Sequence, residues 1–183
     1  KKKYKIISVG RLIERKGFHF LIDSVVSLKK DFPEIQLSIV GNGPYKEFLI
    51  EKLKKTDSTS YIKLEGQVSD QKLIDLYQEA SLFVLAHTLL DNGDTEGCPA
   101  VFSEVMGHGL PVIGGTGAGA DTAIVEGKNG YIVNSKNNKE LSAAIKKIIS
   151  NPKLAESMSK AGAKKLNLNH DPKKNGIAFQ KSI

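Results

Sequence analysis

The stretch LFVLAHTLLDNGDTEGCPAVFSEVMGHGLPVI, residues 82–113, carries the pattern that decides the fold. It begins with a short apolar run at Leu82–Leu85, which predicts a buried strand, and it ends with a second such run at Val112–Ile113. Between them, Ala100–Gly107 has the apolar spacing of a helix, and Pro99 suits its first turn because a proline lacks the N–H that would be unpaired there. A strand, a helix and a strand in this order predict a right-handed crossover between parallel strands.

The same alternation continues along the rest of the chain. Apolar runs rich in Val, Ile and Leu predict four further strands, at Ile6–Val9, Leu37–Val40, Ile62–Leu64 and Tyr131–Val133. Helical patterns stand between and after them, at Phe18–Leu28, Tyr45–Lys55, Asp70–Ala80, Lys139–Ile149 and from Asn151-Pro152 to about Leu168. The apolar runs show no strict alternation with polar residues, which indicates a sheet covered on both faces. The chain is therefore predicted to be an α/β protein with a Rossmann-like, doubly wound parallel sheet.

Length and composition are those of one globular domain. The chain has 183 residues, of which 40% are hydrophobic and 26% charged, and this length is enough for a substantial core. No apolar run approaches the ~18 residues of a membrane span, and no signal-peptide core is present. We predict one domain over residues 1–168 and a tail over residues 169–183, which has no clear period. A core strand that starts within a few residues of Lys1 suggests a domain cut from a longer chain.

Charge and cysteine content exclude several classes of function. The formal net charge is +7, but the lysines are spread over surface-type helix positions with few aromatic residues among them, which disfavours nucleic-acid binding. The charge is compatible with an anionic lipid surface or a polyanionic nucleotide. The single Cys98 rules out an internal disulfide and fits a reducing compartment. None of the four histidines has metal-ligand spacing or stands near Cys98 in sequence, so neither a metal site nor a thiol nucleophile is expected.

Two carboxylates, eight positions apart, stand at the predicted start of the helix over residues 100–107. Glu96 lies in the loop before the helix, and Glu104 is expected in its second turn, roughly 8 Å along the axis. Unpaired N–H groups and the positive end of the helix dipole lie between them and favour an anion. Apolar residues flank Glu104, where an unpartnered carboxylate would be costly. One carboxylate on each side of a phosphate site suits a nucleotide-sugar, which carries hydroxyls at both ends of a diphosphate.

Four motifs occur in a fixed order along the chain: VGRLIERKG at 9–17, IVGNGP at 39–44, Glu-x7-Glu at 96–104 followed by GLPVI, and EGKNGYIV at 126–133. Together they resemble the donor-binding, C-terminal domain of retaining GT-B glycosyltransferases of family 4. The motif TEGCP, residues 95–99, is similar to the corresponding sequence in the family branch that builds bacterial surface polysaccharides. The resemblance implies transfer of a hexose-type sugar from a donor such as a UDP- or GDP-sugar to a glycan or lipid-linked acceptor, without a metal cofactor.

The resemblance also implies a place and a partner. It implies a cytoplasmic protein, and peripheral association with the inner face of the membrane is compatible with this location. The tail over residues 169–183 would pack toward an N-terminal acceptor domain that this chain lacks. An isolated donor domain would then bind its nucleotide-sugar and remain inactive without the other half.

Roles for individual residues follow from the same resemblance. Arg11 and Lys16 would stabilise the charge that develops on the departing nucleoside diphosphate. Glu96 would bind hydroxyls of the transferred sugar, and Glu104 would accept hydrogen bonds from the ribose hydroxyls. Glu96, Arg11 and Lys16 are therefore the expected catalytic residues. Further contacts with the donor are expected at Gly43, at Val68 and Ser69 near the base, and at the loop and helix start formed by Gly97, Cys98, Pro99, Ala100 and Val101.

Other functions remain open on the sequence. A GT-B nucleotide-sugar epimerase, a phosphorylase-like relative and a non-catalytic nucleotide-sugar-binding module would share much of this pattern. Residues 115–120 also fit the G-x-G-x-x-A form of a dinucleotide fingerprint, but no acidic residue ends the next strand at Tyr131–Val133, which disfavours a nicotinamide site. We expect that loop to close over the donor instead.

Overall fold

A computed structural model describes residues 4–90, 93, 100–117 and 119–169 of the chain, and the side chains up to residue 166. Within these residues, parallel strands form one six-stranded sheet in the order β3-β2-β1-β4-β5-β6. The strands are β1 (Tyr4–Val9), β2 (Ile35–Val40), β3 (Ile62–Gly66), β4 (Leu82–Leu85), β5 (Val112–Gly115) and β6 (Gly130–Val133). This is the strand order of a doubly wound α/β sheet, and the predicted fold class is confirmed.

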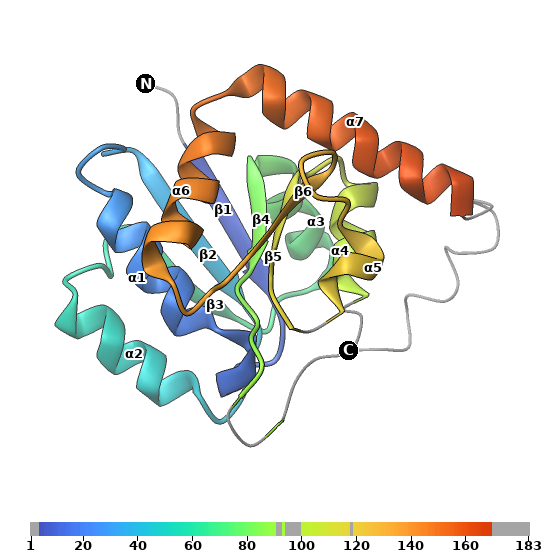
Figure 1. Cartoon of the computed structure of the whole chain (residues 1–183). Coiled ribbons are helices and arrows are strands. Elements are labelled where there is room, and N and C mark those ends of the chain that lie inside the picture. The colour runs from blue at the N-terminus through green and yellow to red at the C-terminus, as the bar shows by residue number, and fades with distance from the viewer. Residues whose placement is uncertain (1–3, 91–92, 94–99, 118, 170–183) are drawn as a thin grey trace.

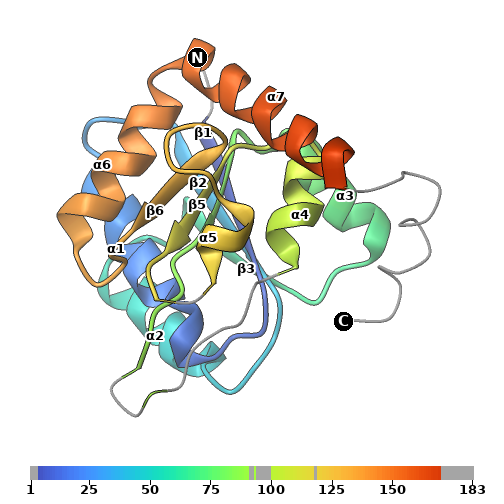
Figure 2. The ribbon, with the colours of Figure 1, turned by 45° about the vertical axis from the view of Figure 1, so that its right-hand side comes forward.

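Helices cover both faces of the sheet (Figures 1 and 2). They are α1 (Phe18–Leu28), α2 (Lys46–Lys55), α3 (Asp70–Glu79), α4 (Val101–Gly107), α5 (Ala120–Ala123), α6 (Asn138–Ile149) and α7 (Pro152–Asn169), with a 3-10 turn η1 at Glu14–Lys16. In Figure 2, α1, α2 and α6 lie on one side of the sheet and α3 and α4 on the other. Helix α7 packs against both α4 and α6. No helix in the described part of the chain is long and apolar enough to cross a membrane.

The core centres on β4, whose four residues are all fully buried. Helix α4 is fixed over this strand by Phe102, which is fully buried and meets the Phe83 ring edge-to-face with centroids 5.8 Å apart. Such pairs add to the stabilisation that burial already gives. The start of α4 is therefore held close to the carboxyl end of β4.

Several element boundaries differ from those expected from sequence. Strands β3, β5 and β6 extend to or begin at glycines, at Gly66, Gly115 and Gly130, because a glycine backbone pairs in a ladder although it adds nothing to an apolar pattern. The turn η1 and the four-residue α5 were not expected, since neither is long enough to show a helical period. Helix α4 begins at Val101, with Ala100 as its N-cap residue.

Candidate functional site

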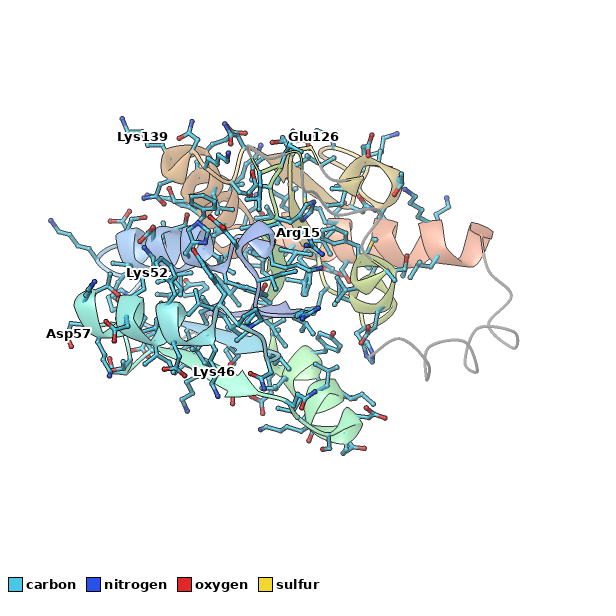
Figure 3. All side chains as sticks on the ribbon, turned by 90° about the horizontal axis from the view of Figure 1, so that it is seen from below. Arg15, Lys46, Lys52, Asp57, Glu126 and Lys139 are labelled. Carbon is cyan, nitrogen blue, oxygen red and sulfur yellow. The ribbon has the colours of Figure 1, made fainter. Side chains whose placement is uncertain are left out.

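The strand order reverses between β1 and β4, which lie side by side although β2 and β3 come between them in sequence. In open α/β sheets, ligands bind outside the carboxyl ends of the strands at such a reversal. Here the two carboxyl ends lead into residues 10–17 and residues 86–90. Figure 3 shows the molecule from below, the side at which β1 and β4 end in Figure 1, with Arg15 near the middle of this edge.

Backbone hydrogen bonds hold the segment after β1 between its two neighbours. On one side, the Leu12 amide donates to the carbonyl of Asn42, which follows β2 (2.9 Å). On the other side, the Thr88 amide, two residues beyond Ala86, donates to the carbonyl of Arg15 (2.9 Å). The loop that carries Arg11 and Lys16 is therefore tied to both adjacent strand ends.

Gly17 explains why the VGRLIERKG motif ends in glycine. Its φ is +66°, and a Cβ built on it would lie 1.8 Å from the carbonyl oxygen of Ala86. No residue with a side chain fits so close a passage, and only glycine adopts this φ without strain. The end of the loop after β1 thus runs directly against the end of β4.

The two predicted cations both lie at the carboxyl end of β1. Arg11 is exposed. Lys16 is half-buried, and its Cε lies 3.5 Å from where a Cβ on Gly10 would stand, so its methylene chain runs back over the end of the strand. The structure places both residues in the loop after β1, beside the reversal point, and their contact with a diphosphate stays a prediction.

The sequence predicts Glu104 in the second turn of this helix, but in the structure it lies in the first turn of α4. The prediction counted the helix from Pro99, whereas α4 begins at Val101, so the turn that holds Glu104 comes earlier in the helix than expected. The side chain is half-buried and has a buried neighbour, Tyr77 of α3. Burial of the phenol, together with the nearby Glu104 carboxylate, raises the pKa of Tyr77 above its ordinary range. Glu104 is therefore not a carboxylate that merely faces solvent.

The rest of the loop before α4 can be placed only in part. Glu96, Gly97, Cys98 and Pro99 lie outside the described residues, so the predicted contacts of these four residues stay predictions. Ala100 is exposed at the N-cap, and Val101 is half-buried at the first helical position.

Gly43, a predicted donor contact, and Val68 and Ser69, predicted near the base, lie along the same edge, after β2 and β3 respectively. A Cβ on Gly43 would stand 2.4 Å from the carbonyl oxygen of Leu12, so this glycine is needed for the close approach of two loops. Val68 is half-buried. Ser69 is the N-cap of α3, and its Oγ accepts a hydrogen bond from the Lys72 amide (3.3 Å). These local roles account for Gly43 and Ser69 within the fold, and their contacts with a donor stay predictions.

Sequence reasoning missed two residues, His87 at the carboxyl end of β4 and Tyr77 of α3, which neighbours Glu104. His87 follows β4, is fully buried, and its Nδ1 lies 3.0 Å from the Leu85 carbonyl oxygen. Its ring lies 5.8 Å from that of Phe102. A single histidine after a strand and a single tyrosine within a helical pattern carry no signal that could have identified them, because their neighbours come from other elements.

The EGKNGYIV motif builds the turn that leads into β6. Glu126, labelled in Figure 3, accepts a hydrogen bond from the Ile132 amide (2.7 Å). The buried Asn129 accepts one from the Val125 amide (2.7 Å) and donates one to the Ala123 carbonyl (3.1 Å). These contacts give the motif a structural role.

The possible dinucleotide fingerprint at residues 115–120 begins at the last residue of β5, and dinucleotide-binding fingerprints also come directly after a strand. It opens only the short helix α5, which begins at Ala120. Among the described residues there is no group of three or more His, Cys, Asp or Glu side chains placed to hold a metal ion.

Comparison with known proteins now identifies the family. The family model described as "Glycosyl transferases group 1" matches residues 1–165. The chain belongs to this family. It is 27% identical over 158 residues to the GDP-mannose-dependent alpha-(1-6)-phosphatidylinositol monomannoside mannosyltransferase of Mycolicibacterium smegmatis, a match that covers 86% of this chain and 41% of the relative. The chain thus spans less than half the length of this curated glycosyltransferase.

Solved structures share the fold. The C-terminal domain of a glycosyl transferase group 1 family protein, LpcC of Francisella tularensis, matches with a TM-score of 0.77 at 23% identity, over 90% of this chain and 85% of that one. HepE of Anabaena in complex with UDP-glucose matches with a TM-score of 0.81 at 20% identity, over 93% of this chain and 45% of HepE. The fold of this group 1 glycosyltransferase chain is that of a GT-B C-terminal domain.

Proposed function

We propose that this chain is the donor-binding domain of a retaining, metal-independent family 4 glycosyltransferase. The whole enzyme would transfer a hexose-type sugar from a UDP- or GDP-sugar to a glycan or lipid-linked acceptor. The observation that carries the proposal is the meeting of three features at one reversal point of the sheet. They are the cationic loop after β1, the end of β4, and the first turn of α4 with Glu104, which Phe102 packs against β4 and His87.

The chemistry at this point is charge stabilisation. Cleavage of a nucleotide-sugar leaves a nucleoside diphosphate with additional negative charge. Arg11 and Lys16, on a loop fixed by backbone hydrogen bonds on both sides, would stabilise that charge as it develops. Glu104 would accept hydrogen bonds from the ribose hydroxyls and Glu96 from hydroxyls of the sugar. The named donors of the mycobacterial relative and of the HepE complex support a nucleotide-sugar as the class of ligand.

The acceptor and the setting belong to the same proposal. The wording TEGCP supports the surface-polysaccharide branch, and the single Cys98 is consistent with the reducing cytoplasm. Positioning an acceptor hydroxyl against the anomeric carbon can lower the barrier by ~7–11 kcal/mol. A GT-B enzyme achieves this between two domains. We therefore expect this chain to bind its donor but to transfer no sugar above background.

A binding screen in EDTA tests the proposal. UDP, GDP and ADP, each with and without a linked sugar, are added to the chain, and thermal unfolding is followed. We expect one nucleoside diphosphate to raise the unfolding temperature without any divalent ion, because ligands that bind only the folded state stabilise it. Calorimetry then gives the affinity. Binding that strictly requires Mg²⁺ or Mn²⁺ would contradict the metal-free reaction, and no binding at all would contradict the function.

Two substitutions make the screen specific to the site. Glu104→Ala should weaken binding by about 1.5–3 kcal/mol, as expected for hydrogen bonds to a charged group. Glu51→Ala, which removes an exposed carboxylate on α2, is the matched control and should leave binding unchanged. Equal losses in the two variants would show that Glu104 has no specific role.

A further inference from the structure

Tyr77 is a buried polar group whose place needs an explanation. It lies on α3, its side chain is 1% exposed, and its hydroxyl makes no hydrogen bond of ordinary geometry to any of the described residues. Buried hydroxyls are nearly always paired, and phenylalanine would fill the same space without the cost of desolvating a hydroxyl. A tyrosine here therefore points to a use for the hydroxyl.

The contacts of Tyr77 place it beside Glu104. The Tyr77 ring packs on that of His108, with centroids 5.0 Å apart and ring planes at 33°. His108 follows the last residue of α4, and Glu104 lies four residues before it, so the two occupy neighbouring places on one face of the helix. A phenol that packs beside His108 thus reaches Glu104 one turn nearer the start of α4. The nearby carboxylate and the burial both raise the pKa of Tyr77, so the phenol stays protonated and can donate.

We propose that Tyr77 is a positioning residue for Glu104, and that its hydroxyl donates to one carboxylate oxygen while a bound ribose donates to the other. This inference rests on the proposed function. In the free protein the phenol and the carboxylate are neighbours without a well-formed hydrogen bond. For the hydrogen bond to form, the carboxylate must turn toward the phenol, and ribose binding favours that turn because both oxygens then have donors. Tyr77 thereby favours a sugar with a 2′-hydroxyl over one without it.

The test measures ribose preference in this chain. Calorimetry in EDTA compares UDP with 2′-deoxy-UDP, and GDP with 2′-deoxy-GDP, for the wild type and for Tyr77→Phe. We expect the ratio of ribo to deoxy affinity to fall at least fivefold in Tyr77→Phe, while affinity for the deoxy nucleotide changes less than twofold. Tyr61→Phe is the matched control, since it removes a hydroxyl at the opposite end of the sheet, just before β3, and should leave the ratio unchanged.

A purely structural role for Tyr77 predicts a different result. Removing an unpaired buried hydroxyl would then leave stability unchanged or raised, with the ribose ratio the same as in the wild type. That outcome overturns the proposal. If Tyr77→Phe does not fold, His108→Ala decides instead: loss of the ring that packs on Tyr77 should also reduce the ratio, and an unchanged ratio overturns the proposal.

The wild-type measurement separates this inference from the proposed function. Wild-type binding with no preference for ribose would overturn the roles of Tyr77 and Glu104 but leave nucleotide binding intact. Absence of any nucleoside diphosphate binding would overturn the proposed function itself, and the inference with it.

Discussion

Gly17→Ala should strongly lower the free energy of unfolding of this chain, and Gly66→Ala is the matched control. Gly17 and Gly66 both have a positive φ of nearly the same size, +66° and +71°. An alanine held in the left-handed region costs about 1–2 kcal/mol at either position. At Gly66 nothing lies within 4 Å of the new methyl group, so this strain is the whole expected cost.

At Gly17 the methyl group would also lie 1.8 Å from the carbonyl oxygen of Ala86. Real Cβ contacts stay beyond 3.0 Å, so the loop after β1 and the end of β4 must separate by more than 1 Å. Overpacking of this kind costs about 1–3 kcal/mol. We therefore expect Gly17→Ala to lower the free energy of unfolding by about 2–5 kcal/mol, and Gly66→Ala by about 1–2 kcal/mol.

Urea unfolding at 25 °C, followed by circular dichroism, measures both losses. Gly17→Ala should also weaken nucleoside diphosphate binding, because the same displacement moves the loop that carries Arg11 and Lys16 away from the end of β4. Gly66→Ala leaves this loop in place. Equal free-energy losses in the two variants would refute the steric argument and, with it, the close passage of the two segments at the reversal point.

Three further predictions concern stability. Burial and the nearby Lys52 hold the pKa of His19 at about 4, below its usual 6.5, so the unfolded chain binds more protons between these values and stability should fall as the pH drops from about 6.5 to about 4. His19→Gln should flatten that pH dependence in urea unfolding, and an unchanged slope would refute the assignment. Ser69→Ala should lower the free energy of unfolding by about 1 kcal/mol through loss of the α3 N-cap, measured in the same way. An unchanged free energy would show that this cap does not stabilise the protein. Asn129→Ala should lower the free energy of unfolding by about 1–3 kcal/mol, because it leaves the Val125 amide unpaired, whereas the Ala123 carbonyl keeps its hydrogen bond from Lys165 Nζ. A loss below about 1 kcal/mol would contradict that role of Asn129.

The sequence predicts an element well where an uninterrupted run of apolar residues marks it as buried. The four residues of β4 are apolar and buried on both faces, so the strand could be placed to the residue. Glycines at the ends of strands could not be placed, because they pair through the backbone and leave no side-chain signal. The first turn of α4 was misplaced for a related reason: Pro99 is compatible with a helix start, but compatibility does not fix where helical backbone begins.

The contacts that organise the site were beyond sequence reasoning. Gly17 touches Ala86, and Tyr77 lies near Glu104, yet each pair comes from different elements and neither leaves a periodic trace. The cations Arg11 and Lys16 could be identified only through the resemblance. Their common position at the end of β1 then follows from the topology.

The most direct test of the account is to locate bound nucleotide by NMR. Amide shifts of the ¹⁵N-labelled chain are followed during titration with UDP or GDP in EDTA. We predict that the perturbed amides cluster in the loop from Arg11 to Lys16 and in the first turn of α4 around Glu104. The opposite end of the sheet holds a cavity of about 280 Å³, partly lined by Tyr4, Ser81 and Leu110. Perturbations confined to that cavity, with the Arg11 loop and α4 unchanged, would contradict the central claim that nucleotide binds at the reversal point.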